Sequence, residues 1–311
     1  MRSSNSLRKT YGETLVELGK ENKDIVMLEA DLGNSTMSGL FLAEYPERYF
    51  QVGIAEQNMA SVGAGLALAG KIPFINSFAV FASGRAYDQI RSSITIPNLN
   101  VKICGSSAGL SDFGDGKTHQ SVDDIALMQV LPNMTVLSPV DAVETEQMVK
   151  AMVEGSGPMY LRINRNDLPV VTDPSEPYYI GKMTKLREGS DVVVFATGIM
   201  VQQSLEAAKI LEDEGISIRV INVSTIKPLD VEQIIAHTEG MKGVVTAEEH
   251  SVIGGLGSTI ASALSKSRLP IELLGIQDQY GTSAENYEIL LQAYGLEPSD
   301  VASRVRSVLE A

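Results

Sequence analysis

Short apolar runs alternate with longer amphipathic stretches along almost the whole chain. Runs such as 24–28 and 192–195 are almost entirely apolar, which is typical of buried strands. Stretches such as 7–21 and 200–214 place their apolar residues at helical spacing. Strands that alternate with helices in this way favour a mostly parallel sheet with helices on both faces.

The same pattern locates the remaining elements. Strands are expected at 49–53, 71–76, 101–105, 135–138, 159–162, 218–223 and 243–248, and helices at 58–69, 85–94, 142–154 and 230–238. Residues 168–191 interrupt the alternation with three prolines and several turn-forming residues, so we expect a linker with a small hairpin there. The chain is therefore predicted to be an α/β protein of two doubly wound, mostly parallel-sheet domains at 1–170 and 191–311, with a linker at 171–190.

Composition narrows the class of protein. With 311 residues, of which 44% are hydrophobic and 21% charged, the chain has the balance of a folded globular protein. No apolar run approaches the roughly 18 residues that span a bilayer, and the N-terminus has no apolar signal core. The single cysteine, Cys104, fits a reducing compartment, and a structural zinc site is not expected. We therefore expect a cytoplasmic protein without membrane contact and without metal ligands of its own.

The formal net charge of −14 has the wrong sign for binding a nucleic-acid backbone. Nucleic acid is therefore not expected as a partner, and any phosphate must be recognised locally. The GGLG motif at 254–257 would bind phosphate at a helix N-terminus. Its spacing favours instead the close packing of a helix on its sheet.

One acidic residue stands between a predicted strand and a glycine- and alanine-rich helix. Glu56 lies in GIAEQNM, at a junction where strand ends usually face a ligand crevice. Removal from water there would suit its carboxyl group to share or donate a proton. Alternatively, Glu56 complements the dipole at the start of the helix and takes no part in chemistry.

Three further segments contain candidate residues. Phe78 and Phe81 in SFAVF offer a flat face for a planar ring, or they pack in the core. His119 in GDGKTHQ is a candidate proton shuttle or hydrogen-bonding partner of a substrate, or else part of a surface turn. Arg162 and Arg165 in LRINRN follow a strand and would reach an anionic substrate, although such arginine pairs are common on protein surfaces.

The order of these motifs resembles that of the transketolase family of thiamine diphosphate enzymes. GIAEQNM, SFAVF, GDGKTHQ, LPNMTVLSPVDAVE, LRINRNDL and TAEEHSVIGGLGS follow one another as in that family, from about residue 5 to the C-terminus. The likeness covers the family's pyrimidine-binding domain and its C-terminal domain. SFAVFASGRAYDQI and TAEEHSVIGGLGS are particularly similar to 1-deoxyxylulose-5-phosphate synthase, which belongs to the same superfamily.

The resemblance implies a cofactor role for three residues. Glu56 matches the family's glutamate that hydrogen-bonds N1′ of the aminopyrimidine of thiamine diphosphate. Phe81 matches the aromatic residue that stacks on this ring, and Phe78 lines the same pocket. The protein would thus supply orientation and a proton relay, while the cofactor carries the carbon chemistry.

The resemblance also implies where the substrate binds. Asp115 and His119 match positions that face the substrate hydroxyls and carbonyl, and His119 is expected to act in catalysis. Arg8, Ser35 and Arg165 match the positions that hold the sugar phosphate in transketolases. Arg165 would grip the phosphate with two parallel hydrogen bonds.

One domain of full-length transketolases has no counterpart in this sequence. In that domain a Gly-Asp-Gly motif with a downstream Asn binds the diphosphate through a metal. Gly114-Asp115-Gly116 sits in GDGKTHQ, which matches the pyrimidine-binding domain instead. The resemblance therefore implies the C-terminal subunit of a split transketolase, inactive alone. An N-terminal partner subunit would supply the Mg²⁺ and diphosphate site, in an α2β2 heterotetramer.

Three departures from the family pattern affect the substrate channel. Cys104-Gly105-Ser106-Ser107 stands where the family usually has Thr-His-Asp-Ser, the loop after Gly109 is about two residues longer, and a tyrosine is replaced near Gly84. The expected reaction moves a two-carbon ketol unit between a ketose phosphate and an aldose phosphate. Alternatives are a decarboxylating thiamine enzyme, similar to 1-deoxyxylulose-5-phosphate synthase or to the β subunit of 2-oxoacid dehydrogenases, and a non-catalytic subunit that keeps the fold.

Overall fold

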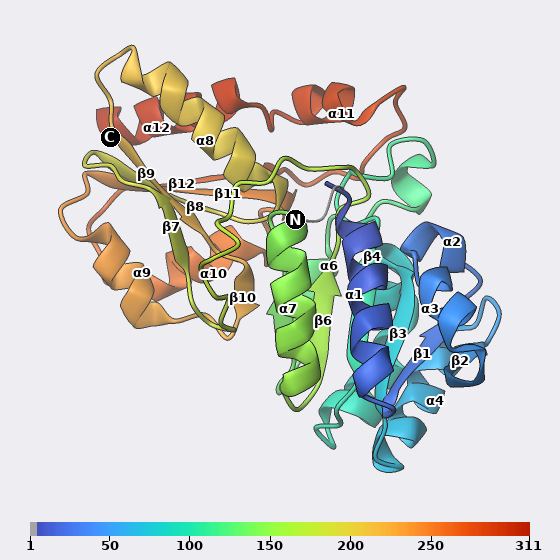
Figure 1. Cartoon of the computed structure of the whole chain (residues 1–311). Helices are drawn as coiled ribbons and strands as arrows, with labels where there is room; N and C mark the ends of the chain where they lie inside the picture. The colour runs from blue at the N-terminus through green and yellow to red at the C-terminus, as the bar shows by residue number, and fades with distance from the viewer. Residues whose placement is uncertain (1–4) are drawn as a thin grey trace.

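Two sheets form the framework of the chain (Figure 1). This computed structural model describes residues 5–311. The larger sheet consists, in spatial order, of β10 (Thr225–Lys227), β5 (Thr135–Leu137), β6 (Met159–Arg162), β4 (Lys102–Ser106), β3 (Ile72–Phe78), β1 (Ile25–Glu29) and β2 (Tyr49–Gln51). The smaller sheet consists of β12 (Ile271–Ile276), β11 (Gly243–Ser251), β8 (Val192–Ala196), β9 (Ile218–Asn222) and β7 (Thr184–Arg187). Neighbouring strands are parallel except in the pairs β10–β5 and β7–β9, so the predicted α/β class with mostly parallel sheets is confirmed.

Helices connect most of these strands. Those of the larger sheet are α1 (Leu7–Glu21), α2 (Gly33–Thr36), α3 (Gly39–Glu44), α4 (Glu56–Leu68), α5 (Tyr87–Gln89), α6 (Asp124–Gln129) and α7 (Ala142–Glu154), with the 3₁₀ turns η1 (Pro46–Arg48) and η4 (Gly116–Thr118). Those of the smaller sheet are α8 (Ile199–Glu212), α9 (Val231–Thr238), α10 (Leu256–Ala263), α11 (Tyr287–Ala293) and α12 (Pro298–Glu310). Within residues 5–311, no helix has the length and apolarity that a membrane crossing requires.

Both faces of the larger sheet are covered because successive strand residues point to opposite sides. Phe74 faces α1, where its ring centroid lies 6.4 Å from that of Tyr11. The next residue, Ile75, faces α4, where Gly63 packs so closely that an added Cβ would lie 2.9 Å from Ile75 Cγ2. In Figure 1, α1 and α7 lie next to each other on one face of this sheet. The apolar strand runs of the sequence thus mark strands that are buried on both faces.

The segment after β3 differs from the regular helix predicted at 85–94. It is helical from residue 81 to residue 95, but two π-turns, η2 (Phe81–Arg85) and η3 (Ile90–Thr95), flank α5. Ser83 and Gly84 in the first π-turn are poor residues for a regular α-helix. One-turn π-helical segments within helices are frequent at functional sites.

The hairpin predicted within residues 168–191 is wrong. In the part of the chain that the structure describes, β7 is the only strand of this stretch, and it pairs with β9 rather than with a neighbouring strand. The edge of the smaller sheet offers β7 backbone hydrogen-bonding partners in β9. The two halves of the chain are also joined through a strand: β10, from the C-terminal half, pairs with β5 at the edge of the larger sheet.

Candidate active site

The parallel strands of the larger sheet place several predicted residues at one edge. Because β1, β3, β4 and β6 are parallel, their carboxyl ends meet there. The loop after β1 carries Ser35, the turn after β3 carries Phe81, the loop after β4 carries His119, and the segment after β6 carries Arg165. Arg8, in the first turn of α1, reaches the same edge.

Glu56 begins α4 and lies almost completely buried, at 1% exposure. Arg85, in the first π-turn, donates from Nη1 to both carboxylate oxygens of Glu56 at 3.0 Å. Ser77 Oγ lies 3.5 Å from Oε1 of the same carboxylate. The buried Glu56 therefore takes part in an ion pair in addition to standing in the first turn of α4. Arg85 itself escaped the sequence prediction, because nothing in the sequence connects it to a carboxylate 29 positions earlier.

The two candidate phenylalanines lie beside this ion pair. The rings of Phe78 and Phe81 are stacked, with centroids 6.3 Å apart and an interplanar angle of 15°. His119 packs edge-on against both rings, 5.4 Å from the Phe81 centroid and 6.2 Å from that of Phe78. The Arg85 guanidinium covers Phe81 at 4.3 Å. Glu56, both phenylalanines and His119 therefore form one cluster.

A second group adjoins this cluster through Arg165, whose guanidinium lies 5.8 Å from the Phe78 ring centroid. Arg165 Nη1 pairs with Asp112 Oδ2 at 3.0 Å. Arg8 donates from Nε to Arg165 O at 3.1 Å and from Nη1 to Ser35 O at 2.6 Å. Burial, and then the charge of Arg165, lower the pKa of Arg8. The structure thus brings the three predicted phosphate-binding residues together and adds an unpredicted carboxylate.

Asp115 stands at the exposed rim of this group, just before the 3₁₀ turn η4. Burial is the main cause that raises the pKa of the Asp112 carboxyl group, and the negative charge of Asp115 raises it further. The charges of Arg165 and His119 oppose this shift. Asp115 and His119 therefore share one loop and one electrostatic environment with Asp112.

The loop that carries Ser35 is organised by a second carboxylate that the sequence prediction missed. Glu29, at the end of β1, is fully buried and accepts hydrogen bonds from the backbone amides of Ala30 and Leu32 and from the hydroxyls of Thr36 and Ser38. Burial raises the pKa of Glu29 to about 7. Its signal in the sequence was an acid at the end of an otherwise apolar strand.

The smaller-sheet half of the chain holds the loop between β4 and α6. Glu249 of β11 accepts from Leu110 N at 2.7 Å, and Gln120 Nε2 donates to Thr282 O at 2.9 Å. Ala284 N donates to Phe113 O at 2.9 Å. Gly109 has φ +65°, and a Cβ there would lie 2.3 Å from Glu249 Cδ. These contacts fix the backbone of the loop that presents Asp112, Asp115 and His119.

Two weaker sequence interpretations are settled by the structure. Arg162 does not reach an open site: it is 5% exposed, bonds Asp124 through Nε, and donates from Nη2 to Glu249 O at 2.8 Å. The GGLG motif packs α10 tightly on its sheet, since an added Cβ at Gly257 would lie 2.6 Å from Thr246 Oγ1. The first amides of α10 donate to Glu248, which leaves them unable to bind phosphate.

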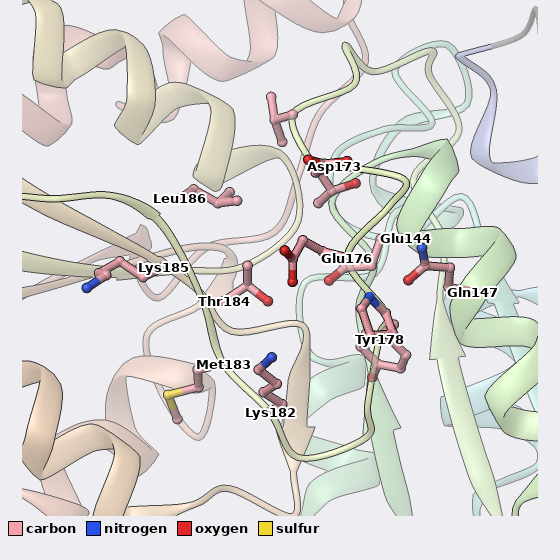
Figure 2. A pocket seen from close by; sticks show the side chains of 13 residues that line it. Glu144, Gln147, Asp173, Glu176, Tyr178, Lys182, Met183, Thr184, Lys185 and Leu186 are labelled. Carbon is pink, nitrogen blue, oxygen red and sulfur yellow. The ribbon is translucent and has the colours of Figure 1, made fainter. Parts of the chain in front are cut away.

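The cavity between α7 and the segment that leads into β7 lies apart from the candidate site. Figure 2 shows a cavity of about 440 Å³ between the segment before β7 and α7, lined by Glu144, Tyr178 and Lys182 among others. None of the predicted site residues lines it. Within residues 5–311, no group of three or more His, Cys, Asp or Glu side chains is arranged to hold a metal ion.

Comparisons with known proteins assign both halves of the chain. A family model described as "Transketolase, pyrimidine binding domain" matches residues 3–171, and one described as "Transketolase, C-terminal domain" matches residues 181–301. The chain is 44% identical over 303 residues to the "Putative transketolase C-terminal section" of Methanocaldococcus jannaschii, covering 96% of this chain and 95% of that protein.

Two further relatives match over nearly their full length. The "6-deoxy-6-sulfo-D-fructose transketolase subunit SqwH" of Clostridium sp. (strain MSTE9) is 38% identical over 305 residues, covering 98% of this chain and 94% of that protein. A solved structure described as "Split gene transketolase, inactive beta4 tetramer" superposes with a TM-score of 0.90 at 46% identity, over 98% of this chain and 99% of that one.

Proposed function

Because the chain belongs to the transketolase family, we propose that it is the C-terminal subunit of a split transketolase. With thiamine diphosphate bound, the assembled enzyme moves a two-carbon ketol unit from a ketose phosphate to an aldose phosphate. The observation that carries the proposal is the buried Glu56 carboxylate beside the stacked Phe78 and Phe81 rings. A subunit without a catalytic role has no physical need for this pairing. Cytoplasmic location is part of the proposal, supported by the single, buried Cys104.

The cluster around Glu56 fits the aminopyrimidine of the cofactor. A buried carboxylate suits a ring nitrogen that must hold a proton, and the half-buried Phe81 ring offers a face for stacking. Arg85 now bonds Glu56 and lies 4.3 Å from the Phe81 ring centroid, so we expect its side chain to withdraw when the aminopyrimidine ring binds. When bound, thiamine diphosphate supplies the carbon nucleophile of the reaction.

The residues divide their roles between the cofactor and the substrate. Glu56 would hold a proton at N1′ of the aminopyrimidine, and the phenylalanines would exclude water from that side of the site. His119, packed on both rings, hydrogen-bonds the substrate carbonyl and moves a proton there. Asp115 at the rim binds hydroxyl groups. Arg8, Ser35 and Arg165 bind the distal anionic end of the sugar.

A partner subunit completes the site in this proposal. Residues 5–311 offer no metal-holding cluster, so we assign the Mg²⁺ and diphosphate ligands to an N-terminal subunit in an α2β2 assembly. The name of the M. jannaschii relative and the split-gene tetramer among the solved structures support this. With its net charge of −14, the assembly is not expected to bind nucleic acid.

A coupled ketol-transfer assay tests the proposal. This chain is assayed alone, and then with the product of the adjacent reading frame, in the presence of thiamine diphosphate, Mg²⁺ and a panel of sugar phosphates. We expect turnover only in the mixture. Turnover by the single chain would contradict the need for a partner. Turnover only after addition of pyruvate would favour the decarboxylating alternative.

The outward face of α4 is the expected contact between subunits. Its exposed residues are uncharged and include Ser61, Val62, Gly65 and Leu68, the last at 74% exposure. A Cβ at Gly65 meets no atom within 4 Å, so this face has room for another helix to approach closely. Gly63 differs, because it packs inward against Ile75.

Replacing Gly65 with leucine is expected to weaken assembly by at least about tenfold without unfolding the chain. The leucine points to open space in the single chain but would collide with a close-packed partner. Sedimentation velocity over a concentration series measures the association, and Tm checks the fold. Lys209→Leu, at an exposed position of α8, controls for the added apolar surface. Unchanged association of the Gly65 variant would move the interface elsewhere.

A further inference from the structure

A carboxylate is built into the distal end of the proposed substrate site. Asp112 is 3% exposed, and its Oδ2 accepts from Arg165 Nη1 at 3.0 Å. It lies in the stretch Ser111-Asp112-Phe113, the part of the loop that is longer than the family pattern. The Arg165 side chain stays 32% exposed, so an incoming anion would meet an arginine that is already paired.

The backbone of Asp112 is fixed, so its carboxylate is held beside Arg165. Asp112 O accepts from Gln120 Nε2 at 3.2 Å and from Gly116 N at 3.3 Å. The preceding residue is held as well: Ser111 Oγ accepts from Arg165 N at 3.1 Å, and Ser111 O accepts from Asn166 Nδ2. The loop thus cannot carry Asp112 away without breaking several hydrogen bonds.

This end of the site carries less positive charge than its two arginines alone would give it. Arg8 and Arg165 supply two positive charges, and Asp112 removes one of them. Phosphate monoesters carry nearly two negative charges at pH 7, whereas a sulfonate or carboxylate carries one. Because electrostatic repulsion is proportional to charge, Asp112 opposes a phosphate about twice as strongly as a singly charged group.

We propose that Asp112 is a specificity-determining residue that makes the distal site accept singly charged donor ends, such as a sulfonate, alongside phosphates. The inference rests on the proposed function, because it takes Arg8, Ser35 and Arg165 as the distal site of the substrate.

The test is Asp112→Asn in the assembled enzyme. Asparagine has nearly the same shape, and its carbonyl oxygen still accepts from Arg165, so the loop keeps its anchor. Donors are a 6-phosphorylated ketose and the same ketose with a 6-sulfonate. In the wild type we expect the two kcat/KM values to agree within about tenfold. In the variant we expect the ratio of phosphate to sulfonate to rise by at least tenfold. Asp213→Asn, at an exposed position after α8, is the matched control.

A binding measurement separates this inference from the proposed function. Methylphosphonate at pH 8 is mostly a dianion, whereas methanesulfonate is a monoanion of similar shape. At equal ionic strength, the shift in Tm of the chain with methylphosphonate should grow in Asp112→Asn, and the shift with methanesulfonate should change less. If ketol transfer is absent but this difference appears, the proposed function fails, and only the charge selectivity that Asp112 gives to the anion site is supported. The inference is overturned if two quantities stay unchanged in both Asp112→Asn and Asp112→Ser. The first is the ratio of kcat/KM for the phosphate donor to that for the sulfonate donor, and the second is the ratio of the Tm shift with methylphosphonate to that with methanesulfonate.

Discussion

Replacing Glu56 with glutamine is expected to lower kcat of the assembled enzyme by about a hundredfold to ten-thousandfold. Glutamine fills the same space but cannot take up or release the proton at N1′ of the aminopyrimidine. The exchange of the C2 hydrogen of bound thiamine diphosphate for deuterium, followed by NMR, should slow in parallel. That rate reports the proton relay directly and does not depend on the sugar substrate.

Cofactor affinity separates this effect from simple loss of binding. Glu56→Gln also loses the ion pair and one of the two hydrogen bonds with Arg85, which weakens the hold on the guanidinium beside Phe81. We therefore expect kcat to fall far more than the affinity for thiamine diphosphate. Glu206→Gln, an exposed residue of α8, should leave both quantities unchanged. Retention of full turnover by Glu56→Gln would remove Glu56 from the catalytic assignment.

Replacing Asp124 with alanine is expected to lower the free energy of unfolding by about 3–5 kcal/mol. Asp124 is fully buried, accepts from Arg162 Nε at 3.0 Å and from Tyr160 Oη at 2.8 Å, and has no access to water. Without it, the guanidinium of Arg162 remains buried with its counter-charge removed. Urea denaturation followed by circular dichroism measures the change.

The neighbouring residue supplies the control for this variant. Asp123 is exposed, and within residues 5–311 its carboxylate accepts a hydrogen bond from Ser121 Oγ at 3.2 Å. Asp123→Ala should therefore change the free energy of unfolding by less than about 1 kcal/mol. If Asp124→Ala proved as stable as Asp123→Ala, the buried ion pair would not contribute to the stability of the native chain.

The sequence predicted elements well where their stabilising pattern is local. The helix expected at 7–21 and the strand expected at 159–162 begin and end as predicted, because periodicity and capping define them within the segment. The hairpin expected within residues 168–191 was wrong because its strand, β7, pairs with β9, a partner about 35 residues further along the chain. The regular helix expected at 85–94 failed because π-turns depend on packing as well as on composition.

The candidate site follows the same division. Glu56, Phe81 and His119 were found from motifs whose residues carry chemistry, and parallel strands bring such motifs to one edge. Arg85 and Asp112 were missed because each acquires its role from a partner distant in sequence. A carboxylate or guanidinium on its own gives no indication of which opposite charge it will meet after folding.

The close contact between Gly109 and Glu249 couples the two halves of the chain. No residue larger than glycine fits at position 109 while the glutamate stays in place, and the positive φ adds to the strain of any replacement. A larger residue at position 109 therefore requires the Glu249 side chain to move or to be replaced by a smaller one. Exchange of either half for that of a distant relative should therefore disturb the loop that presents His119 wherever the hybrid places a larger residue at position 109 opposite Glu249.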